Sequence, residues 1–437
     1  MTKPQPLYIG IDIGTSGVRA CAINQQGEIQ HSCNTSLPPP DVDQHSVTQY
    51  AELWWEATRN VLVNIFSVID ASQVQSISVN GTSGTVLVCD KDGNPVAPAR
   101  MYNDAFCTDQ ANKISSVAPP QSAAHGTSSG LAKLLYLQQK FPQAVYLCHQ
   151  TDWIVGKLSG RFDITDQNNA LKTGYDPIED KWPDWFSQLN INTSLLPQVV
   201  APGSVISTVL GELFPEIFNG QKLNPKCQII SGTTDSIAAF MATGASKPGD
   251  AVTSLGSTLV LKVISETPVS APEFGIYSHK FGDYWLAGGA SNSGGAVLLN
   301  YFTPQQLDLH TASLNSIQTG KNFKLTGLNY YPLLKAGERF PINDPLLEPI
   351  LEPKPKTELE FFQAILEGIS KIELDGYKKL QQLGAPFPTH IETTGGGSKN
   401  MAWNNIRQQT LGVPVKQAVF NEACYGSALL AMRGCKT

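Results

Sequence analysis

Apolar and polar residues alternate along the first part of the chain with the period of two that predicts β-strands. Three such strands are predicted: LYIGIDI (7–13), VRACAIN (18–24) and GEIQHSCNTS (27–36). A helix follows over 48–69, where apolar residues recur at every fourth position: Leu53, Ala57, Val61 and Ile65. Alternation then returns at 74–81. Three strands, a helix and a further strand favour a mixed sheet flanked by helices.

The second half of the chain begins with the same kinds of pattern. The stretch KCQIISGTTDSIAAFMATG (226–244) predicts a strand, a turn at GTTD and a helix. GDAVTSLGSTLVLKVIS (249–265) repeats the strand, the Gly/Ser/Thr turn and the strand of the first hairpin. An amphipathic helix is predicted over 358–380, and a strand that ends in a glycine run is predicted within THIETTGGGSKN (389–400).

We therefore expect two related α/β domains. A length of 437 residues is typical of two to three domains, and the repeated hairpin places the junction after about residue 226. The N-terminal domain is expected to span 1–226, with a loop-rich middle region, and the C-terminal domain to span 227–437. The last helix, at about 422–435, is expected to pack back on the N-terminal domain.

Composition and charge narrow the class of function. The net charge is −6 and basic residues form no runs, which argues against nucleic acid as a partner. No segment approaches the ~18 consecutive apolar residues of a membrane helix. The N-terminal stretch MTKPQPLYIG lacks the apolar segment of a secretory signal, and the eight cysteines match no zinc or disulfide spacing. We expect a reduced, cytoplasmic monomer or homodimer that acts on small molecules.

Candidate chemistry begins in the first hairpin, at DIGTSG (12–17). Gly14 lets the backbone turn tightly and approach a ligand, while Thr15 and Ser16 add hydroxyl donors. Such amides and hydroxyls suit phosphate oxygens, and the carboxylate of Asp12 suits a Mg²⁺ ion. A plain hairpin turn beside a surface aspartate accounts for the same residues, so this stretch alone leaves both interpretations open.

A second hairpin makes the phosphate interpretation the better one. Its turn carries Gly256, Ser257 and Thr258, again with donors but without a carboxylate. Two such loops, one from each half of the chain, could hold a polyphosphate between the domains.

The third glycine loop lies at TTGGGSKN (393–400). Three glycines in a row, Gly395, Gly396 and Gly397, leave room for a flat ligand ring, with Asn400 beside it. Trp403 could lie against that ring. The alternative is a core tryptophan that anchors the following helix, and the residues do not decide between the two.

A carboxylate at the start of a predicted helix is the candidate base. Asp235 falls in the first turn, with Thr233 or Thr234 as the N-cap, and an acid there gains ~0.3–1 kcal/mol from the helix dipole. A helix-stabilising aspartate would look the same. The functional alternative is a carboxylate that accepts a hydrogen bond from a substrate hydroxyl.

Taken in order, these motifs resemble the signatures of the FGGY carbohydrate kinases. The segments that carry the resemblance are GIDIGTSGVR, RMYNDAFCTDQ, TDWIVGKLSG, DITDQNNALKTGYD, SGTTDSIAAFMATGA, SLGST, TTGGGSKN and GSALLA. The resemblance implies an α/β, two-domain actin/hexokinase-like (ribonuclease H-like) fold with a cleft between the domains, and it implies ATP and Mg²⁺. It also implies that Asp235 is the catalytic base, that Asp12 lies near the metal in the active site, and that the glycine run and Asn400 surround the adenosine.

Within that family the chain is similar to short ketopentose kinases of the xylulokinase and ribulokinase group, particularly compact D-ribulose kinases. Two departures concern the sugar. YNDAFCTDQ has Phe106 where many members have arginine, and NGTSGTV places Thr82 and Ser83 where xylulokinases carry larger polar groups. Asp104, Thr82 and Ser83, with Asp12 and Asp235, would still offer hydrogen bonds to a sugar, although a β-turn explains 82–83 almost as well.

We therefore predict transfer of the γ-phosphoryl of ATP to a ketopentose, with D-ribulose first and D-xylulose as the alternative. A sugar sensor of the same fold with little turnover is a second alternative. A nucleotide-dependent protein such as actin or a heat-shock chaperone would need no sugar-oriented base. A two-carboxylate glycosidase built on Asp12 and Asp235 would leave the phosphate loops unexplained.

Overall fold

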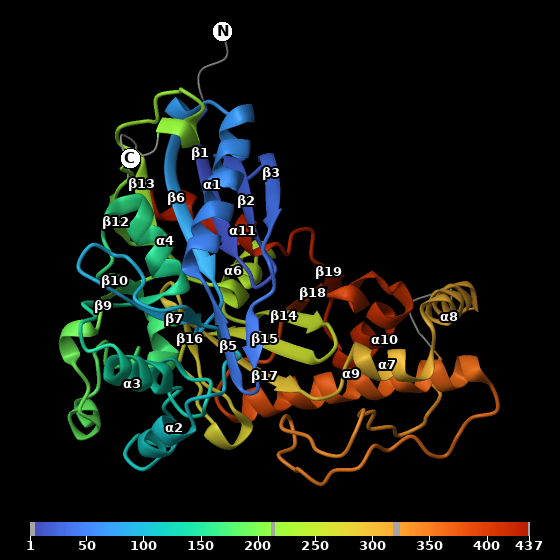
Figure 1. Cartoon of the computed structure of the whole chain (residues 1–437). Helices are drawn as coiled ribbons and strands as arrows, with labels where there is room; N and C mark the ends of the chain where they lie inside the picture. Colours follow the sequence, from blue (N-terminus) through green and yellow to red (C-terminus); the bar gives the residue numbers. More distant parts are fainter. Residues whose placement is uncertain (1–4, 211–214, 318–323, 436–437) are drawn as a thin grey trace. The chain divides into compact units, whose positions relative to one another are not determined.

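The computed structural model describes residues 5–210, 215–317 and 324–435, and the chain folds into two compact units (Figure 1). The first unit comprises the residues up to Gly244 together with those from Phe420 onward, and the second unit is Ala245–Val419. The first four residues of the N-terminal stretch MTKPQPLYIG lie outside the described residues.

A six-stranded mixed sheet forms the centre of the first unit. In spatial order its strands are β12 (Val205–Thr208), β13 (Gln228–Thr234), β6 (Val74–Gly81), β1 (Leu7–Ile13), β2 (Gly17–Asn24) and β3 (Ile29–Ser36). β1, β2 and β3 form an antiparallel meander, and β6 and β13 continue the sheet parallel to β1. The predicted strands and the mixed sheet are therefore confirmed.

Two helices cover opposite faces of this sheet, as the period of two along β1 requires. Ile9 and Ile11 pack in the same core as α1 (Ala51–Val68), whereas Tyr8 packs with α11 (Ala423–Gly434). α11 crosses so close to β1 that a Cβ on Gly10 would lie 2.0 Å from the Cys424 carbonyl oxygen. Asp12 alternates with the isoleucines and so belongs to the face that α11 covers.

Smaller elements complete the first unit. The remaining helices are α2 (Thr108–Ser115), α3 (Gly130–Lys140), α4 (Gln150–Ser159), α5 (Gln167–Ala170) and α6 (Asp235–Ala242). A second sheet contains β4 (Asp41–Asp43), β5 (Ser46–Gln49), β8 (Ala99–Arg100), β7 (Val86–Cys89) and β9 (Tyr146–His149), and β10 (Ile164–Asp166) pairs with β11 (Gln198–Val200). The predicted stripe of α1 is buried at Ala57, Val61 and Ile65 and half-buried at Leu53.

The second unit repeats the antiparallel meander and the parallel strands of the first, but its sixth strand lies at the opposite edge. Its strands, in spatial order, are β16 (His279–Phe281), β17 (Tyr284–Ser291), β15 (Leu259–Ser265), β14 (Asp250–Leu255), β18 (His390–Thr394) and β19 (Val415–Gln417). β14, β15 and β17 form an antiparallel meander, and β18 and β19 run parallel to β14. The helices are α7 (Gly295–Tyr301), α8 (Pro304–Ile317), α9 (Glu358–Gln382) and α10 (Met401–Leu411). Both units thus contain the predicted hairpin.

The boundary between the units differs from the predicted one after residue 226. It lies at Gly244/Ala245, because β13 pairs with β6 inside the first sheet and α6 follows β13 directly. The predicted turn at GTTD is absent, since β13 runs through Thr234 and the helix begins at Asp235. Gly232 permits this strand to lie against β6, because a Cβ there would lie 1.6 Å from the Val79 carbonyl oxygen.

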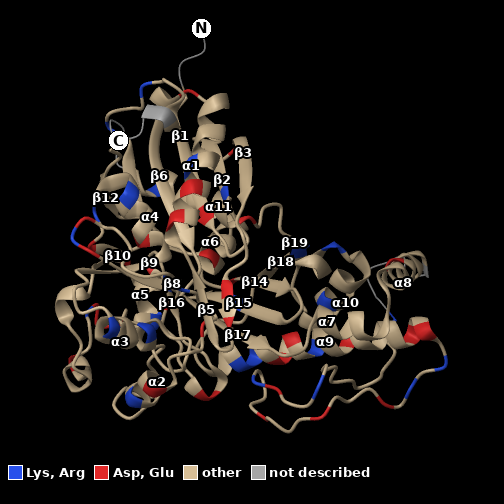
Figure 2. Ribbon diagram, in the orientation of Figure 1, with Lys and Arg blue, Asp and Glu red and all other residues tan. Residues whose placement is uncertain are grey.

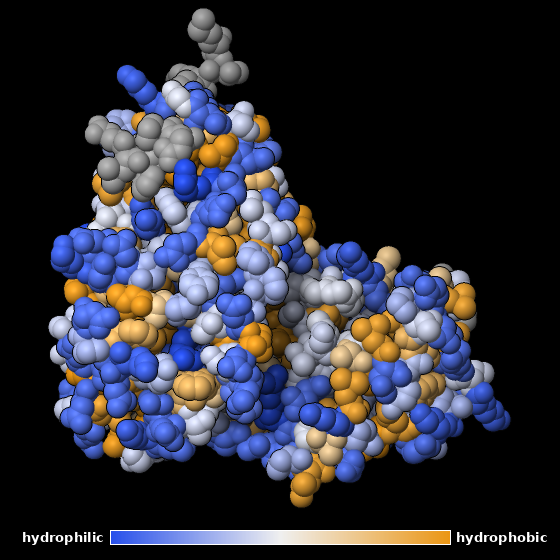
Figure 3. Space-filling model, viewed as in Figure 1, coloured by the Kyte–Doolittle hydropathy of each residue, from blue (hydrophilic) through white to orange (hydrophobic). Residues whose placement is uncertain are grey.

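Surface features agree with the charge pattern of the sequence. Lysine and arginine are interspersed with aspartate and glutamate along both units (Figure 2). On the face drawn in Figure 3, hydrophobic side chains form small groups among polar ones. None of the helices in the described ranges has the length and apolar character that crossing a bilayer demands. All eight cysteines are free thiols.

Candidate active site

The carboxyl ends of three parallel strands bring the candidate sugar-side residues of the first unit to one edge of its sheet. β1, β6 and β13 are neighbours, and Asp12 lies opposite Asn80, which in turn lies opposite Thr233. Asp235 follows the end of β13, and Thr82 follows the end of β6. Strands lie ~4.8 Å apart, so the ends of β1 and β13 are separated by about 10 Å. Edges of this kind are where open α/β sheets bind ligands.

Asp12 is a buried carboxylate in an unfavourable environment for its charge. It is 5% exposed, and its Oδ2 accepts one long hydrogen bond of 3.4 Å from the half-exposed guanidinium of Arg19. Burial is the main reason that the pKa of Asp12 rises to about 6, and the negative charge of Asp235 raises it further, while Arg19 opposes the rise. A nearby cation would favour the ionised carboxylate and so oppose the effects of both burial and Asp235 on the pKa.

Asp235 occupies the first position of α6, as predicted, with Thr234 as the N-cap. Its side chain is half-buried, and its Oδ1 accepts a hydrogen bond of 2.6 Å from the backbone amide of Ser236. The hydroxyl of Thr234 makes no cap hydrogen bond. The Asp235 carboxylate instead accepts from a backbone amide of the first helical turn. Partial positive charge at a helix N-terminus stabilises an anion.

The loop Gly14–Ser16 joins β1 to β2 as a tight hairpin turn. The Gly14 amide donates to the Gly17 carbonyl at 3.0 Å, and Thr15 and Ser16 lie on the outside of the turn, half-buried and exposed respectively. Both hydroxyl residues are therefore placed where a ligand could reach them beside Asp12.

Thr82 and Ser83 behave differently although they are adjacent. Thr82 is buried, and its hydroxyl lies 2.8 Å from Gln150 Oε1 and 2.6 Å from Thr85 Oγ1. Ser83 is half-buried as a residue, but its hydroxyl oxygen is buried and has no hydrogen-bond partner among the described residues. Of the two predicted sugar contacts, Thr82 has its hydroxyl hydrogen-bonded inside the protein, whereas the buried hydroxyl of Ser83 has no partner among the described residues.

Asp104 does not fit its predicted sugar contact. The side chain is fully buried, and its Oδ2 accepts from the Val47 amide at 2.8 Å and from Arg100 at 2.9 Å. The Arg100 guanidinium in turn lies over the rings of Phe106 and Tyr136. Asp104 is therefore a structural carboxylate whose hydrogen bonds are made within the protein.

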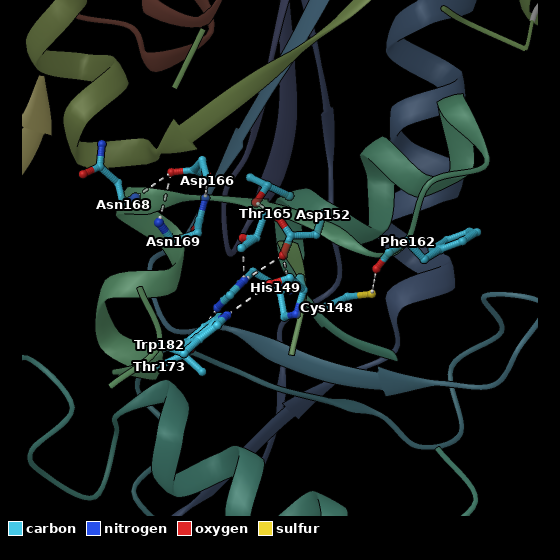
Figure 4. Close-up of polar contacts among 12 residues, drawn as sticks. Cys148, His149, Asp152, Phe162, Thr165, Asp166, Asn168, Asn169, Thr173 and Trp182 are labelled. Atoms are coloured by element: carbon cyan, nitrogen blue, oxygen red, sulfur yellow. Dashed lines mark hydrogen bonds and ion pairs between the residues drawn. The ribbon is translucent and has the colours of Figure 1, made fainter. Parts of the chain in front are cut away.

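A buried polar network surrounds His149, which precedes α4, and Asp166, which precedes α5 (Figure 4). His149 Nδ1 lies 2.7 Å from Asp152 Oδ2 and 2.9 Å from Thr165 Oγ1, and its Nε2 lies 2.9 Å from Thr173 Oγ1. Asn168 donates to Thr233 Oγ1 at 2.9 Å and so ties α5 to the end of β13. The contacts of His149 fix the start of α4. The hydrogen bond from Asn168 fixes the end of β13, the strand that leads to Asp235.

Burial also perturbs Asp166 in this network. Its Oδ1 accepts from the amides of Asn168 and Asn169, at 2.8 and 3.1 Å, and so caps α5. Burial raises the pKa of Asp166 to about 6, although the hydrogen bonds from Asn169 oppose the rise.

In the second unit, a pocket of about 490 Å³ lies among the predicted nucleotide loops. Gly256 and Ser257, Gly396 and Gly397, and Asn400 contribute to its lining, together with α7 and α8 residues that the sequence did not single out: Gly295, Ala296, Leu299, Leu307, Asp308 and Thr311. Thr258 lies in the same hairpin turn and is half-exposed. The pocket is large enough for a purine nucleoside, within the ~300–1,000 Å³ typical of ligand sites.

The consecutive glycines 395–397 differ in the space that surrounds each of them. Gly395 has a φ of +80°, and a Cβ there would lie 2.6 Å from the Leu255 carbonyl oxygen. A Cβ on Gly397 would lie 2.8 Å from both Leu255 Cβ and Trp403 Cζ3. A Cβ on Gly396 would meet nothing within 4 Å. Two of the glycines therefore serve packing, and Gly396 keeps the pocket open.

Trp403 is the core tryptophan of the two alternatives. It is 1% exposed, belongs to the same hydrophobic core as Ile369 and Ile406, and donates from Nε1 to Ser370 Oγ at 3.2 Å. Trp403 is among the residues that line the pocket, but at 1% exposure its ring has no open face for an adenine ring. Asn400 caps α10 by accepting from the Trp403 amide at 3.0 Å and donates to Thr311 at 2.9 Å.

Sequence reasoning did not identify Lys133, Gln150 and Asn168, which contact the candidate sugar turn or the strand end beside Asp235. Two features of the sequence could have indicated two of these residues. Lys133 lies inside the apolar run GLAKLLYL, and Asn168 lies in the amide-rich stretch DQNNA. Both indicate buried polar groups that need partners.

Comparisons with known proteins identify the family to which the chain belongs. Residues 7–242 match the N-terminal domain, and residues 251–435 the C-terminal domain, of the FGGY family of carbohydrate kinases. The chain is 24% identical to xylulose kinase of Staphylococcus xylosus, over 98% of this chain and 90% of that protein. It is 20% identical to gluconokinase of Bacillus subtilis, over 97% and 86%.

Solved structures resemble it along nearly the whole chain. Ligand-bound xylulose kinase from Lactobacillus acidophilus superimposes with a TM-score of 0.81 at 20% identity, covering 98% of this chain and 89% of that one. Glycerol kinase from Plasmodium falciparum with ADP gives a TM-score of 0.82 at 17% identity, with the same coverage. The fold is thus that of the two-domain sugar kinases. Both halves of the chain match their family models, and the chain belongs to the FGGY family of carbohydrate kinases.

Proposed function

We propose that this carbohydrate kinase transfers the γ-phosphoryl of ATP to a primary hydroxyl of a ketopentose, with D-xylulose as the first candidate. The observation that carries the proposal is the pair of carboxylates, Asp12 and Asp235, at the carboxyl ends of β1 and β13, on either side of β6, whose end leads to the turn that contains Ser83. The sequence alone placed D-ribulose first. Relatives named xylulose kinase, from Staphylococcus and Escherichia among others, support D-xylulose instead.

In the proposed reaction the sugar oxygen attacks the γ-phosphorus, the bond to the β–γ bridging oxygen breaks, and ADP leaves. Asp235 orients the hydroxyl and takes its proton. The transition state of phosphoryl transfer is loose, so positioning and charge neutralisation supply most of the catalysis. Thr15 and Ser16 of the first unit, and Ser257 and Thr258 of the second, are proposed to donate hydrogen bonds to the phosphates, and the pocket beside Gly396 is proposed to take the adenosine.

The residues present also fit a magnesium ion at Asp12. Mg²⁺ is usually held by one or two carboxylates together with substrate phosphates, and a cation is what the raised pKa of Asp12 calls for. Within the described ranges, no group of three or more His, Cys, Asp and Glu side chains forms a metal cage of its own. Bound there, the ion would neutralise charge that develops on the phosphates.

The choice of sugar is tested with a panel in a coupled ADP-release assay. D-xylulose, D-ribulose, gluconate and glycerol are compared at equal ATP and Mg²⁺, and D-xylulose is expected to give the highest kcat/KM. A higher value for D-ribulose would restore the sequence-based order. Preference for gluconate or glycerol would contradict a ketopentose kinase.

The base is tested with Asp235→Asn. Loss of a general base lowers kcat by about 100- to 10,000-fold, whereas ATP binding, measured as the rise in melting temperature with ATP, should be unchanged. Asp109→Asn is the matched control, because Asp109 is an exposed aspartate in the first turn of α2. Near-normal turnover of the Asp235 variant would show that another group is the base.

A further inference from the structure

Lys133 is a fully buried lysine on α3 whose ammonium group joins three turns. Its Nζ donates to the carbonyl oxygens of Gly84 at 2.7 Å, Met101 at 2.7 Å and Ser128 at 2.9 Å, and the Tyr102 carbonyl lies at 3.4 Å. An ammonium has three N–H donors, and each has a carbonyl partner. One side chain therefore fixes the turn after β6, the turn after β8 and the turn before α3.

Gln150 holds the other end of the turn after β6. Its Oε1 accepts from the Thr82 amide at 2.9 Å and from the Thr82 hydroxyl at 2.8 Å. Because this atom accepts from two donors, the amide orientation of Gln150 is defined, and the His149 network positions the start of α4 on which it stands.

The residue between these two attachments is Ser83. The Thr85 amide donates to the Thr82 carbonyl at 3.3 Å, and Gly84 has the φ of +88° that the third position of a type II turn requires. Lys133 holds Gly84 and Gln150 holds Thr82, which leaves Ser83 as the member of the turn whose hydroxyl is unpartnered.

We propose that Lys133 and Gln150 are positioning residues that clamp the turn at 82–85, so that the buried, unpartnered hydroxyl of Ser83 is fixed in the position from which it bonds the sugar. The inference rests on the proposed function, because it assigns the turn to the sugar site. The reason is energetic: a hydroxyl on a mobile turn loses conformational freedom when it binds, whereas a clamped one does not. Small errors of placement near a reacting group reduce rates by up to about 100-fold.

The first test compares Lys133→Met with Lys140→Met. A methionine side chain nearly matches the length of lysine but has no N–H donors, and Lys140 is an exposed lysine at the end of the same helix. With D-xylulose and ATP as substrates, Lys133→Met should raise the KM for the sugar by about tenfold or more and leave the KM for ATP within about twofold. Lys140→Met should change neither. An unchanged sugar KM in a folded Lys133 variant would overturn the proposal.

Gln150→Leu removes the hydrogen bonds between Gln150 and Thr82. It tests the proposed clamp independently if the Lys133 variant does not fold. It should also raise the sugar KM selectively. A double-mutant cycle with Ser83→Ala separates positioning from general loosening: the effect of Ser83→Ala on the sugar KM should largely disappear in the Gln150→Leu background. Additive effects would show that Gln150 does not act through Ser83.

Hydrogen–deuterium exchange without any substrate gives a readout that does not depend on the sugar. Amides of 82–85 should exchange at least about tenfold faster in either clamp variant, with no change in β18 or α9. If the wild-type protein phosphorylates none of the sugars, the proposed function fails, and the exchange result still decides whether the clamp exists. Faster exchange with an unchanged sugar KM would mean that the clamp does not serve sugar binding.

Discussion

Asp12 is held in the folded protein at a cost to stability. Its pKa rises from 3.8 to about 6, so between these pH values the native state binds the proton more tightly than the unfolded chain does. The free energy of unfolding therefore falls as the pH rises through this window, and the loss stays in place at neutral pH. At 1.36 kcal/mol per pKa unit the loss is about 3 kcal/mol. Asp12→Asn should accordingly be more stable than wild type by about 1–3 kcal/mol at pH 7–8, and inactive.

Urea unfolding between pH 4 and pH 8 measures this difference. The stability gain of Asp12→Asn should shrink as the pH falls through about 6 and vanish near 4, where both forms are neutral. Wild-type activity should decline over the same acidic range, because the proposed metal site needs the ionised carboxylate. If Asp12→Asn is less stable than wild type at pH 8, then interactions within the protein already stabilise the ionised carboxylate of Asp12.

At the scale of single residues, sequence patterns identify the kind of side chain but not the partners that it already has. The places of Asp12 at the end of a strand and of Asp235 at the start of a helix were predictable, because these are local features of the sequence. Asp104 was not, since its partners Arg100 and Val47 are set by tertiary contacts. The same holds for Thr82, whose hydroxyl is taken by Gln150.

At the scale of elements, the glycine run that follows β18 allows the packing role of one glycine to be tested against the pocket-lining role of another. Gly397→Ala places a methyl group 2.8 Å from Leu255 and Trp403, and overpacking of this kind costs about 1–3 kcal/mol. Gly396→Ala meets no atom within 4 Å and lines the pocket. We expect Gly397→Ala to lower the melting temperature, and Gly396→Ala to preserve it while raising the KM for ATP by a few-fold.

Thermal unfolding and ATP titration of the two variants provide the measurements. Each variant serves as the control for the other, because the change of residue is the same and only its surroundings differ. Equal melting temperatures would contradict the packing role of Gly397. An unchanged KM for ATP in Gly396→Ala would place the nucleotide elsewhere.

Elements with local signals were the predictable part of the fold. The two hairpins follow from alternation and turn residues, and the apolar stripes of α1 and α9 follow from the helical period. The boundary at 226 was wrong because β13 looks like the start of a new domain in sequence, whereas it completes the first sheet beside β6. Strand pairing between distant segments carries no local signal.

At the scale of the whole molecule, the two units differ in the number of chain segments that form them. The first is assembled from two separate segments, since α11 packs against β1 and α6 from the other end of the sequence. The second is the single segment Ala245–Val419, and its hydrophobic core consists of residues from that segment, from Ala251 to Val415. The pocket assigned to the nucleotide is also lined by residues of this segment.

A protein consisting of residues 245–419 should therefore fold alone and bind ATP. Its own core, which includes Phe362 and Trp403, supplies the apolar burial that an independent domain needs. Circular dichroism should show one cooperative thermal transition, and ATP should raise its midpoint, because a ligand at 100 times its Kd adds about 2.7 kcal/mol. Gly396→Leu, which would fill the pocket, should keep the transition and abolish the ATP effect. A non-cooperative transition would mean that the core requires the first unit, whereas a cooperative one without an ATP effect would mean that the nucleotide requires its residues.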